Sequence, residues 1–245
     1  MELRDAGLTL KPSKCFLGYD RAEYLGHRIA NGCLYTQEDK IEKLLHAPPP
    51  HTKQQLRSFI GLASFYRKFI DKFSDKAKCL TDLTKKNSPN QVQTVWTEKH
   101  QGAFELLKRE LSCNPVLKLP ESGKSFTLRS DASNDGIGAV LLQEHDGILM
   151  PTAYASRKLQ PNEIAYSVIE KECLAIVWAV RKFHIYLFGQ EFFVEVDHRP
   201  LSYLAEAKFT NPRVMRWALS LQPYKYSIKA IKGSENGVAD YMSRM

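Results

Sequence analysis

Four acidic residues follow or interrupt segments whose apolar character disfavours an isolated charge. They are Asp131 in SFTLRSDAS, Glu172 in EKECLAIVWAV, Asp197 in FFVEVDHRPL and Asp240 in ENGVADYMSR. A shared divalent cation would explain all four, and oxygen-only ligands favour Mg²⁺, with Mn²⁺ as a substitute. Two such ions about 3.5–4 Å apart activate water and stabilise the departing oxygen in phosphodiester hydrolysis. The residue types therefore predict a carboxylate cluster that holds metal and cuts phosphodiester bonds.

The helical segment around residue 172 carries two acids, and helix geometry separates them. At about 100° per residue, Glu172 shares one face with small and apolar residues. These are Ala165, Val168, Ile169, Ala175, Ile176 and Ala179. A charge on a buried face is costly unless it is paired or bound to metal. Glu170 points nearly the opposite way, toward Arg181, and is predicted to be an ordinary surface charge.

Each of the other three acids has an ordinary alternative role. Asp131 could cap the turn SDASND, and Asp197 could pair with Arg199. Asp240 could place a favourable negative charge at the start of the last helix. These alternatives stay open, and Glu172 is the acid that they explain least.

The elements that carry the four acids have a distinctive order. Strands are predicted at 126–130, 136–143, 151–156, 192–196 and 224–231, with Asp146-Gly147 turning between the second and third. A long helix is predicted from residue 162 to about 188, with short helices at 200–205 and 212–221 and a helical start at 238. This order predicts an α/β domain with a mixed five-stranded sheet. Asp131 and Asp197 then fall at strand ends, where ligand sites of α/β sheets gather.

The preceding segment combines a small hairpin region with helices. Strands with a tight turn at Asn31-Gly32 are predicted over 14–36, and a helix over 37–46 ends at a proline run. Thr52 and Gln55 form a capping-box pattern that opens a helix whose apolar spacing continues to Ile70. A polar loop at 87–94 and a helix at 98–112 follow, and the prolines and glycine of 114–123 predict a domain boundary.

Basic and aromatic residues interleave along and after the helix that begins beyond Thr52. They include Lys53, Arg57, Tyr66, Arg67 and Lys68. One interpretation is a solvated helix face, and the other is a surface that follows a nucleic-acid backbone. The net charge of +8 and the pI near 9.1 also suggest a polyanionic partner.

Composition narrows the class of protein. A chain of 245 residues with 43% hydrophobic content is long enough for two folded domains rather than a disordered tail. The five cysteines have no zinc-site spacing and are expected to be reduced. The sequence contains neither a membrane span nor a signal peptide, so we expect an intracellular protein, cytoplasmic or nuclear and not secreted.

The sequence resembles the C-terminal part of a gypsy-type LTR retrotransposon reverse transcriptase over essentially its whole length. The motifs are LTLKPSKCFLG with YLGH, LRSFIGLASFYRKFI, FELLKRELSCNPVL, RSDASNDGIGAVLLQ, AYASRKL, EKECLAIVWAV, VDHRPL, RW and ENGVADYMSR. The resemblance implies four segments. They are the end of the palm with a primer-grip-like hairpin (1–36), a helical thumb (37–95), a connection (96–122) and an RNase H-like domain (123–245).

The resemblance implies hydrolysis of the RNA strand of RNA–DNA hybrids with two Mg²⁺ ions. The catalytic metal ligands carry over as Asp131, Glu172, Asp197 and Asp240. Expected nucleic-acid contacts are Tyr24, Gly26 and His27 of the primer-grip-like turn, Arg157, and the basic helix residues Lys53, Arg57, Tyr66, Arg67 and Lys68. Expected partners are the hybrid, duplex nucleic acid and, within a polyprotein, the upstream polymerase fingers and palm; no membrane partner is expected.

Two departures from the family pattern qualify that expectation. The stretch 231–236 lacks the histidine that many RNases H carry before their last aspartate, which puts its proton-shuttling role in doubt. No Tyr/Phe-x-Asp-Asp pair occurs, so DNA synthesis by this chain alone is not expected. The alternative functions are a catalytically inactive nucleic-acid-binding remnant of a degenerate retroelement and a structural module that binds only protein.

Overall fold

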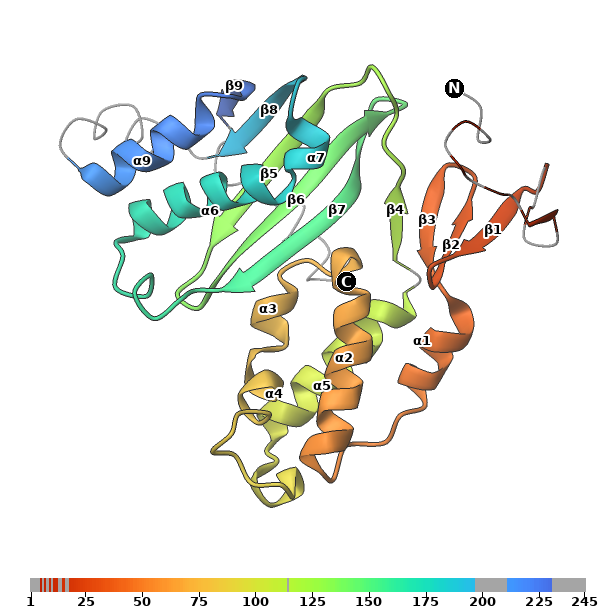
Figure 1. The fold of residues 1–245 in the computed structure, drawn as a ribbon. Coiled ribbons are helices and arrows are strands. Elements are labelled where there is room, and N and C mark those ends of the chain that lie inside the picture. Colours follow the sequence, from red (N-terminus) through yellow and green to blue (C-terminus); the bar gives the residue numbers. More distant parts are fainter. Residues whose placement is uncertain are drawn as a thin grey trace.

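The computed structural model describes residues 18–113, 115–196 and 211–230, and six single positions before residue 18. Within these residues the chain forms a four-stranded sheet of order β1-β2-β3-β4 and a five-stranded sheet of order β7-β6-β5-β8-β9. Figure 1 shows one group of helices below both sheets and a second group against the face of the larger sheet that is turned away from the first group. The prediction of an α/β architecture with a mixed five-stranded sheet is confirmed.

The small sheet is built on two tight turns. Its strands are β1 (Arg21–Tyr24), β2 (His27–Ala30), β3 (Cys33–Thr36) and β4 (Val116–Lys118). Both residues of the Asn31-Gly32 turn have positive φ, as do both residues of Leu25-Gly26. This geometry matches the twist of the flanking strands and confirms the predicted turn at Asn31-Gly32. The pairing of β4 with β3 joins segments about eighty residues apart and was not predicted.

The lower group of helices shares one apolar core. Its members are α1 (Glu38–Leu45), α2 (Lys53–Phe65), α3 (Phe73–Lys76), α4 (Lys78–Asp82), α5 (Glu98–Ser112) and the 3₁₀ helices η2 (Arg67–Phe69) and η3 (Val92–Val95). Leu44, Leu56 and Phe104 are among its buried side chains. The predicted capping box of Thr52 and Gln55 is confirmed. The helix ends at Phe65 rather than continuing to Ile70, although Ile70 is still buried in the same core. The predicted loop at 87–94 contains the start of η3.

The larger sheet is mixed because its central strand has one antiparallel and one parallel neighbour. Its strands are β5 (Phe126–Ala132), β6 (Gly136–His145), β7 (Ile148–Lys158), β8 (Glu191–Val196) and β9 (Lys225–Ala230). β5 pairs antiparallel with β6 and parallel with β8. Asp146 and Gly147 both have positive φ, and the predicted hairpin between β6 and β7 is confirmed.

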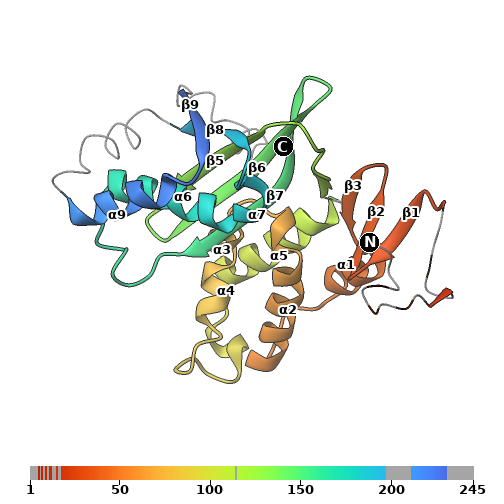
Figure 2. The same cartoon turned by 45° about the horizontal axis from the view of Figure 1, so that its top comes forward.

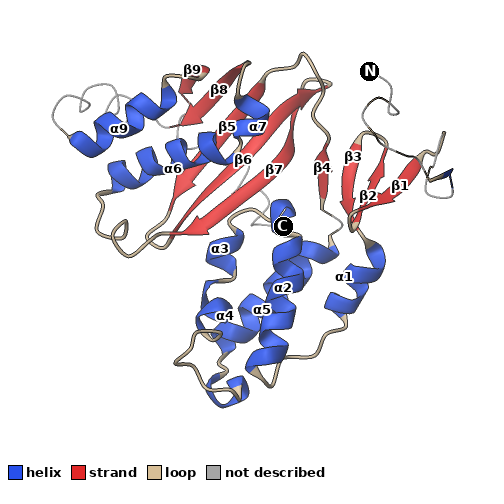
Figure 3. Ribbon diagram, in the orientation of Figure 1, coloured by secondary structure: helices blue, strands red, loops and turns tan. Residues whose placement is uncertain are grey.

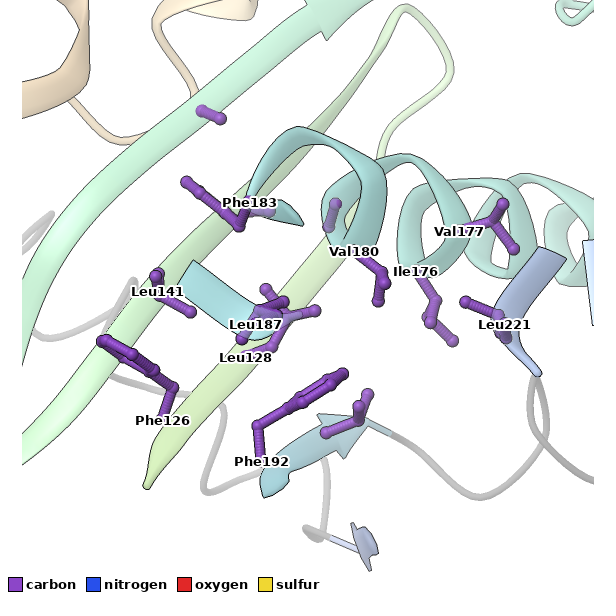
Figure 4. Close-up of a cluster of buried hydrophobic side chains, with 14 of the residues drawn as sticks. Phe126, Leu128, Leu141, Ile176, Val177, Val180, Phe183, Leu187, Phe192 and Leu221 are labelled. Carbon is purple, nitrogen blue, oxygen red and sulfur yellow. The ribbon is translucent and has the colours of Figure 1, made fainter. Parts of the chain in front are cut away.

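Within the part of the chain that the structure describes, one face of this sheet is covered by α6 (Val168–Lys182), α7 (His184–Leu187) and α9 (Pro212–Leu221). Figure 4 shows how Leu128 of β5 and Phe192 of β8 face Val180 of α6 across the core. The prediction of one helix over 162–188 was wrong at its start, because Ser167 caps α6 and the preceding residues form turns. At its end, Phe183 separates α6 from the short α7.

The opposite face of the sheet rests on the lower helices. Tyr154 of β7 packs into their core, and α3 contacts β6 and β7. Figures 2 and 3 show the lower helices against these strands from two directions. The predicted helices at 200–205 and from 238 lie outside the described residues, and the division into four segments stays a prediction. Among the described residues, no helix combines the length and the apolar character needed to cross a membrane.

Candidate active site

Asp131 lies near the end of the central strand and forms an ion pair with a lysine of the same chain. Its side chain is 50% exposed, and its Oδ2 atom is 2.6 Å from Nζ of Lys72. Lys72 precedes α3 and has a left-handed backbone with φ of 47°. Burial alone would lower the pKa of Lys72, but the hydrogen bond to Asp131 and the nearby carboxylates raise it. The Asp131 position therefore already accommodates a positive charge.

Glu172 lies in the first half of α6. Ala175, Ile176 and Ala179 of the predicted face are buried, whereas Val168 at the start of the helix is exposed. Glu172 itself is partly buried. Burial, followed by the charges of Glu172 and Glu170, raises the pKa of the neighbouring Cys173 to about 12. The apolar face is thus confirmed from Glu172 onward, and Ala165 lies in the turn before the helix.

The prediction that Glu170 is an ordinary surface charge was wrong. Its side chain is 15% exposed and forms a capping box with Ser167 at the start of α6. Its Oε1 atom also accepts a hydrogen bond of 3.0 Å from Arg213, which stacks 3.9 Å from the ring centre of Tyr166. Burial alone would raise the pKa of Glu170, but hydrogen bonds from Ser167 and the charge of Arg213 lower it. Glu170 therefore joins the beginnings of α6 and α9.

Asp197 and Asp240 lie outside the described residues, so the alternatives proposed for them stay untested. Asp197 directly follows β8 in the sequence, and β8 pairs with β5 so that Glu195 lies opposite Arg129. These two side chains form an ion pair. Among the described residues no three His, Cys, Asp or Glu side chains form a metal cluster, and only two of the four predicted acids are described. The predicted metal ligands are carboxylate oxygens, the type that Mg²⁺ prefers. The ion pair with Lys72 shows that the Asp131 position accommodates a positive charge.

A segment of the lower helices contacts the larger sheet near Asp131, and the sequence analysis did not predict these contacts. We call residues 67–82, which comprise η2, α3 and α4, the arm. Its contacts with the sheet are Arg67 to the Ser156 carbonyl, the Ser74 amide to Ser156 Oγ, Ser133 Oγ to Asp75, Lys78 to Asp135, and Lys158 to Thr81 and Asp82. The only sequence signal was a set of lysines, and two of them, Lys72 and Lys78, pair with acids more than fifty residues away.

The turn that resembles a primer grip exposes Tyr24 and buries His27. Tyr24 is 63% exposed. His27 is buried beside Phe65, with ring centres 5.1 Å apart, and its Nδ1 lies 3.0 Å from the Leu25 carbonyl. Burial first, and then the charges of Lys68 and Lys40, lower the pKa of His27. Gly26 has a φ of 77°, and a Cβ there would lie 2.9 Å from the Phe65 ring. The turn is therefore held against the end of α2.

The basic helix residues divide into internal and surface groups. Lys53 is 8% exposed, and its Nζ donates to the carbonyls of Lys85 and Ser88. Tyr66 is 0% exposed and donates to the Gly26 carbonyl at 3.0 Å. Both side chains are therefore engaged inside the protein, which favours a structural role for them over a contact with nucleic acid. Arg57 and Arg67 are exposed, although each donates to a backbone carbonyl, and Lys68 is partly exposed.

Arg157 is held by a buried carboxylate. Its guanidinium donates two hydrogen bonds to Glu163, at 2.6 and 2.9 Å, in a bidentate pair. It also lies 5.8 Å from the ring centre of Trp178. Burial would raise the pKa of Glu163, but Arg157 and the Gln160 amide lower it. The structure therefore gives Arg157 an anchoring contact for the segment that precedes α6.

Comparison with known proteins agrees with this arrangement. Residues 121–224 match the family described as an RNase H-like domain found in reverse transcriptase. The whole chain is 38% identical over 244 residues to the retrovirus-related Pol polyprotein of Drosophila melanogaster transposon 297, and 34% identical over 251 residues to that of transposon gypsy. Over essentially its full length, the chain is thus similar to one segment of these Pol polyproteins. It covers 22% and 24% of the length of those two relatives.

Solved structures have a similar fold. A foamy viral protease-reverse transcriptase in complex with dsDNA matches with a TM-score of 0.71 at 22% identity, over 88% of this chain and 45% of the other. The complex of that enzyme with an RNA/DNA hybrid matches with a TM-score of 0.70 at 22% identity, over 87% and 29%. The mixed sheet with its flanking helices is therefore an RNase H-like fold.

Proposed function

We propose that this Pol segment hydrolyses the RNA strand of RNA–DNA hybrids as the RNase H part of a retrotransposon reverse transcriptase. The observation that carries the proposal is the position of Asp131. It lies near the end of the central strand of an RNase H-like sheet and forms an ion pair with Lys72. α6 packs against the same strand and carries the partly buried Glu172. The match of residues 121–224 to reverse transcriptase RNase H-like domains supports this reading.

The carboxylates of Asp131, Glu172, Asp197 and Asp240 would hold two divalent cations, Mg²⁺ or Mn²⁺. When bound, such cations polarise the scissile phosphate and activate water. The chain's own carboxylates orient the site and compensate the positive charge. Glu170 and its partner Arg213 fix the start of α6, and so hold the backbone that carries Glu172.

The nucleic acid would lie along exposed basic and aromatic residues of the hairpin and the lower helices. The proposed contacts are Tyr24 and the backbone of Gly26 in the turn, with Arg57, Arg67 and Lys68 along and after α2. Their exposure and the net charge of +8 support a contact with phosphates. The foamy viral enzyme with a similar fold binds an RNA/DNA hybrid, which agrees with this choice of substrate.

Cleavage of a hybrid with labelled RNA tests the proposal. The 245-residue chain is expected to cut the RNA strand with Mg²⁺, and Asp131→Asn and Glu172→Gln are expected to lower the rate at least a hundredfold, as the loss of groups that position metal does. Asp135→Asn is the matched control, because this exposed acid follows the same strand and pairs with Lys78. Full activity of Asp131→Asn would contradict the assignment. Salt-sensitive hybrid binding without turnover in Mg²⁺ or Mn²⁺ would instead support the non-catalytic alternative.

A further inference from the structure

A lysine from the lower helices occupies the cation position of the proposed active site. The Nζ atom of Lys72 lies 2.6 Å from Oδ2 of Asp131. The two residues come from different parts of the fold, since Lys72 precedes α3 and Asp131 is the second-last residue of β5. An ammonium group and a divalent cation would compete for the same carboxylate oxygen. The contact therefore bears directly on how the site takes up metal.

The local structure makes room for this lysine. Gly138 lies opposite Asp131 in the register of β5 and β6. A Cβ atom at Gly138 would lie 3.3 Å from Cγ of Lys72, tighter than an ordinary contact. The Lys72 stem thus lies against Gly138, where a larger residue would crowd it. Its left-handed backbone, with φ of 47°, is a conformation that non-glycine residues seldom adopt, and it starts α3 beside the sheet.

The arm offers the ammonium a second carboxylate. Asp75 also belongs to the arm, and its charge acts on Lys72 together with that of Asp71. The Oδ1 atom of Asp75 is buried and has no hydrogen-bond partner among the described residues, while Oδ2 accepts from Ser133. Because the rest of the arm is fixed to the sheet by several polar contacts, only the Lys72 side chain has to move.

We infer that Lys72 competes with the divalent cation for Asp131 and thereby sets the metal affinity of the site. This inference rests on the proposed metal-binding role of Asp131. In the metal-free protein the ammonium compensates the Asp131 charge, and metal binding displaces it toward the other carboxylates of the arm. Lys72 is thus a residue that tunes the affinity without contacting the substrate. A partly exposed ion pair changes an equilibrium by up to about fivefold, which sets the expected size of the effect.

Manganese binding to the 245-residue chain tests the inference without relying on activity. Free Mn²⁺ is measured by electron paramagnetic resonance for the wild type, Lys72→Gln, Lys72→Arg and Lys78→Gln. Lys72→Gln is expected to bind Mn²⁺ about fivefold more tightly, and Lys72→Arg to stay within twofold of the wild type. Lys78→Gln is the matched control, because Lys78 belongs to the same arm but pairs with Asp135 instead of Asp131. The Mn²⁺ affinity of this variant is expected to be unchanged.

Asp131→Asn separates the two ways in which the idea can fail. Added to Lys72→Gln, it is expected to abolish the gain in affinity. If binding depends on Asp131 but Lys72→Gln leaves it within twofold, the inference is wrong and the proposed function stands. If none of the proteins binds Mn²⁺ through Asp131, the proposed function and the inference both fail.

Discussion

Replacement of Lys53 by methionine separates an internal lysine from a nucleic-acid contact. Lys53 is the first residue of α2, and its ammonium donates to the carbonyls of Lys85 and Ser88 in the loop that follows α4. A hydrogen bond to a charged group contributes about 1.5–3 kcal/mol, and a carbonyl that regains water recovers part of this. Because that loop is largely exposed, we expect Lys53→Met to lower the free energy of unfolding by ~2 kcal/mol.

The loss is measured by urea unfolding and by thermal melting. For a chain of this size, ~2 kcal/mol lowers Tm by roughly 4–8 °C. Lys86→Met is the matched control, because Lys86 is an exposed lysine of the same loop, and we expect its Tm to change by less than about 1 °C. Methionine keeps the length of the lysine stem, so the comparison isolates the ammonium.

Hybrid affinity as a function of salt gives the second readout. Each phosphate contact contributes roughly 0.7–0.9 to the slope of log affinity against log salt concentration. Lys53→Met is expected to leave this slope unchanged, because the ammonium is engaged inside the protein. Lys68→Met is expected to reduce it by about one contact, since Lys68 is partly exposed beside η2. A lower slope for Lys53→Met with an unchanged Tm would refute the internal role.

Two further variants test how the turn and α6 are held. Gly26→Ala is expected to lower the free energy of unfolding by about 1 kcal/mol more than Gly32→Ala does. Both positions have positive φ, but only a Cβ at residue 26 would clash with Phe65. Equal losses on urea unfolding would contradict this. Glu170→Gln is expected to destabilise the chain at pH 7 by about 1 kcal/mol. The folded-state pKa of Glu170 is lowered, so its contribution is present above the ordinary Glu pKa and is lost as pH falls through the folded value. The difference from wild type should therefore shrink as the pH falls below the ordinary Glu pKa, and a pH-independent difference would show that the carboxylate charge is not the cause.

Local signals predicted the elements whose causes lie within a few residues. The capping box at Thr52, the turns at Asn31-Gly32 and Asp146-Gly147, and the limits of α5 all appear as predicted. In each case the atoms that satisfy the backbone belong to the segment itself. The start of α6 was misplaced because apolar spacing extends through residues 162–166, whereas Ser167 and Glu170 provide the cap.

Roles that depend on distant partners could not be predicted in this way. Lys53 and Tyr66 looked like surface residues because their spacing matches a basic, aromatic helix. Their partners, the carbonyls of the loop at 85–88 and of Gly26, are tens of residues away. Lys72 carried no signal beyond its charge, and its contact with Asp131 spans 59 positions in the sequence. The mixed sheet was predictable from local signals, but the lysine beside Asp131 was not.

The RNase H-like sheet and the lower helices depend on each other at the proposed site. Residues 121–224 contain strands β5 to β8 of the sheet, but the partly buried Tyr154 of β7 packs against the core of the lower helices. Removal of those helices would expose this face of β7 and would also remove Lys72, the charge partner of Asp131. A segment restricted to the family match would therefore differ from the intact chain in the stability of its sheet and in the electrostatics of its candidate metal ligand.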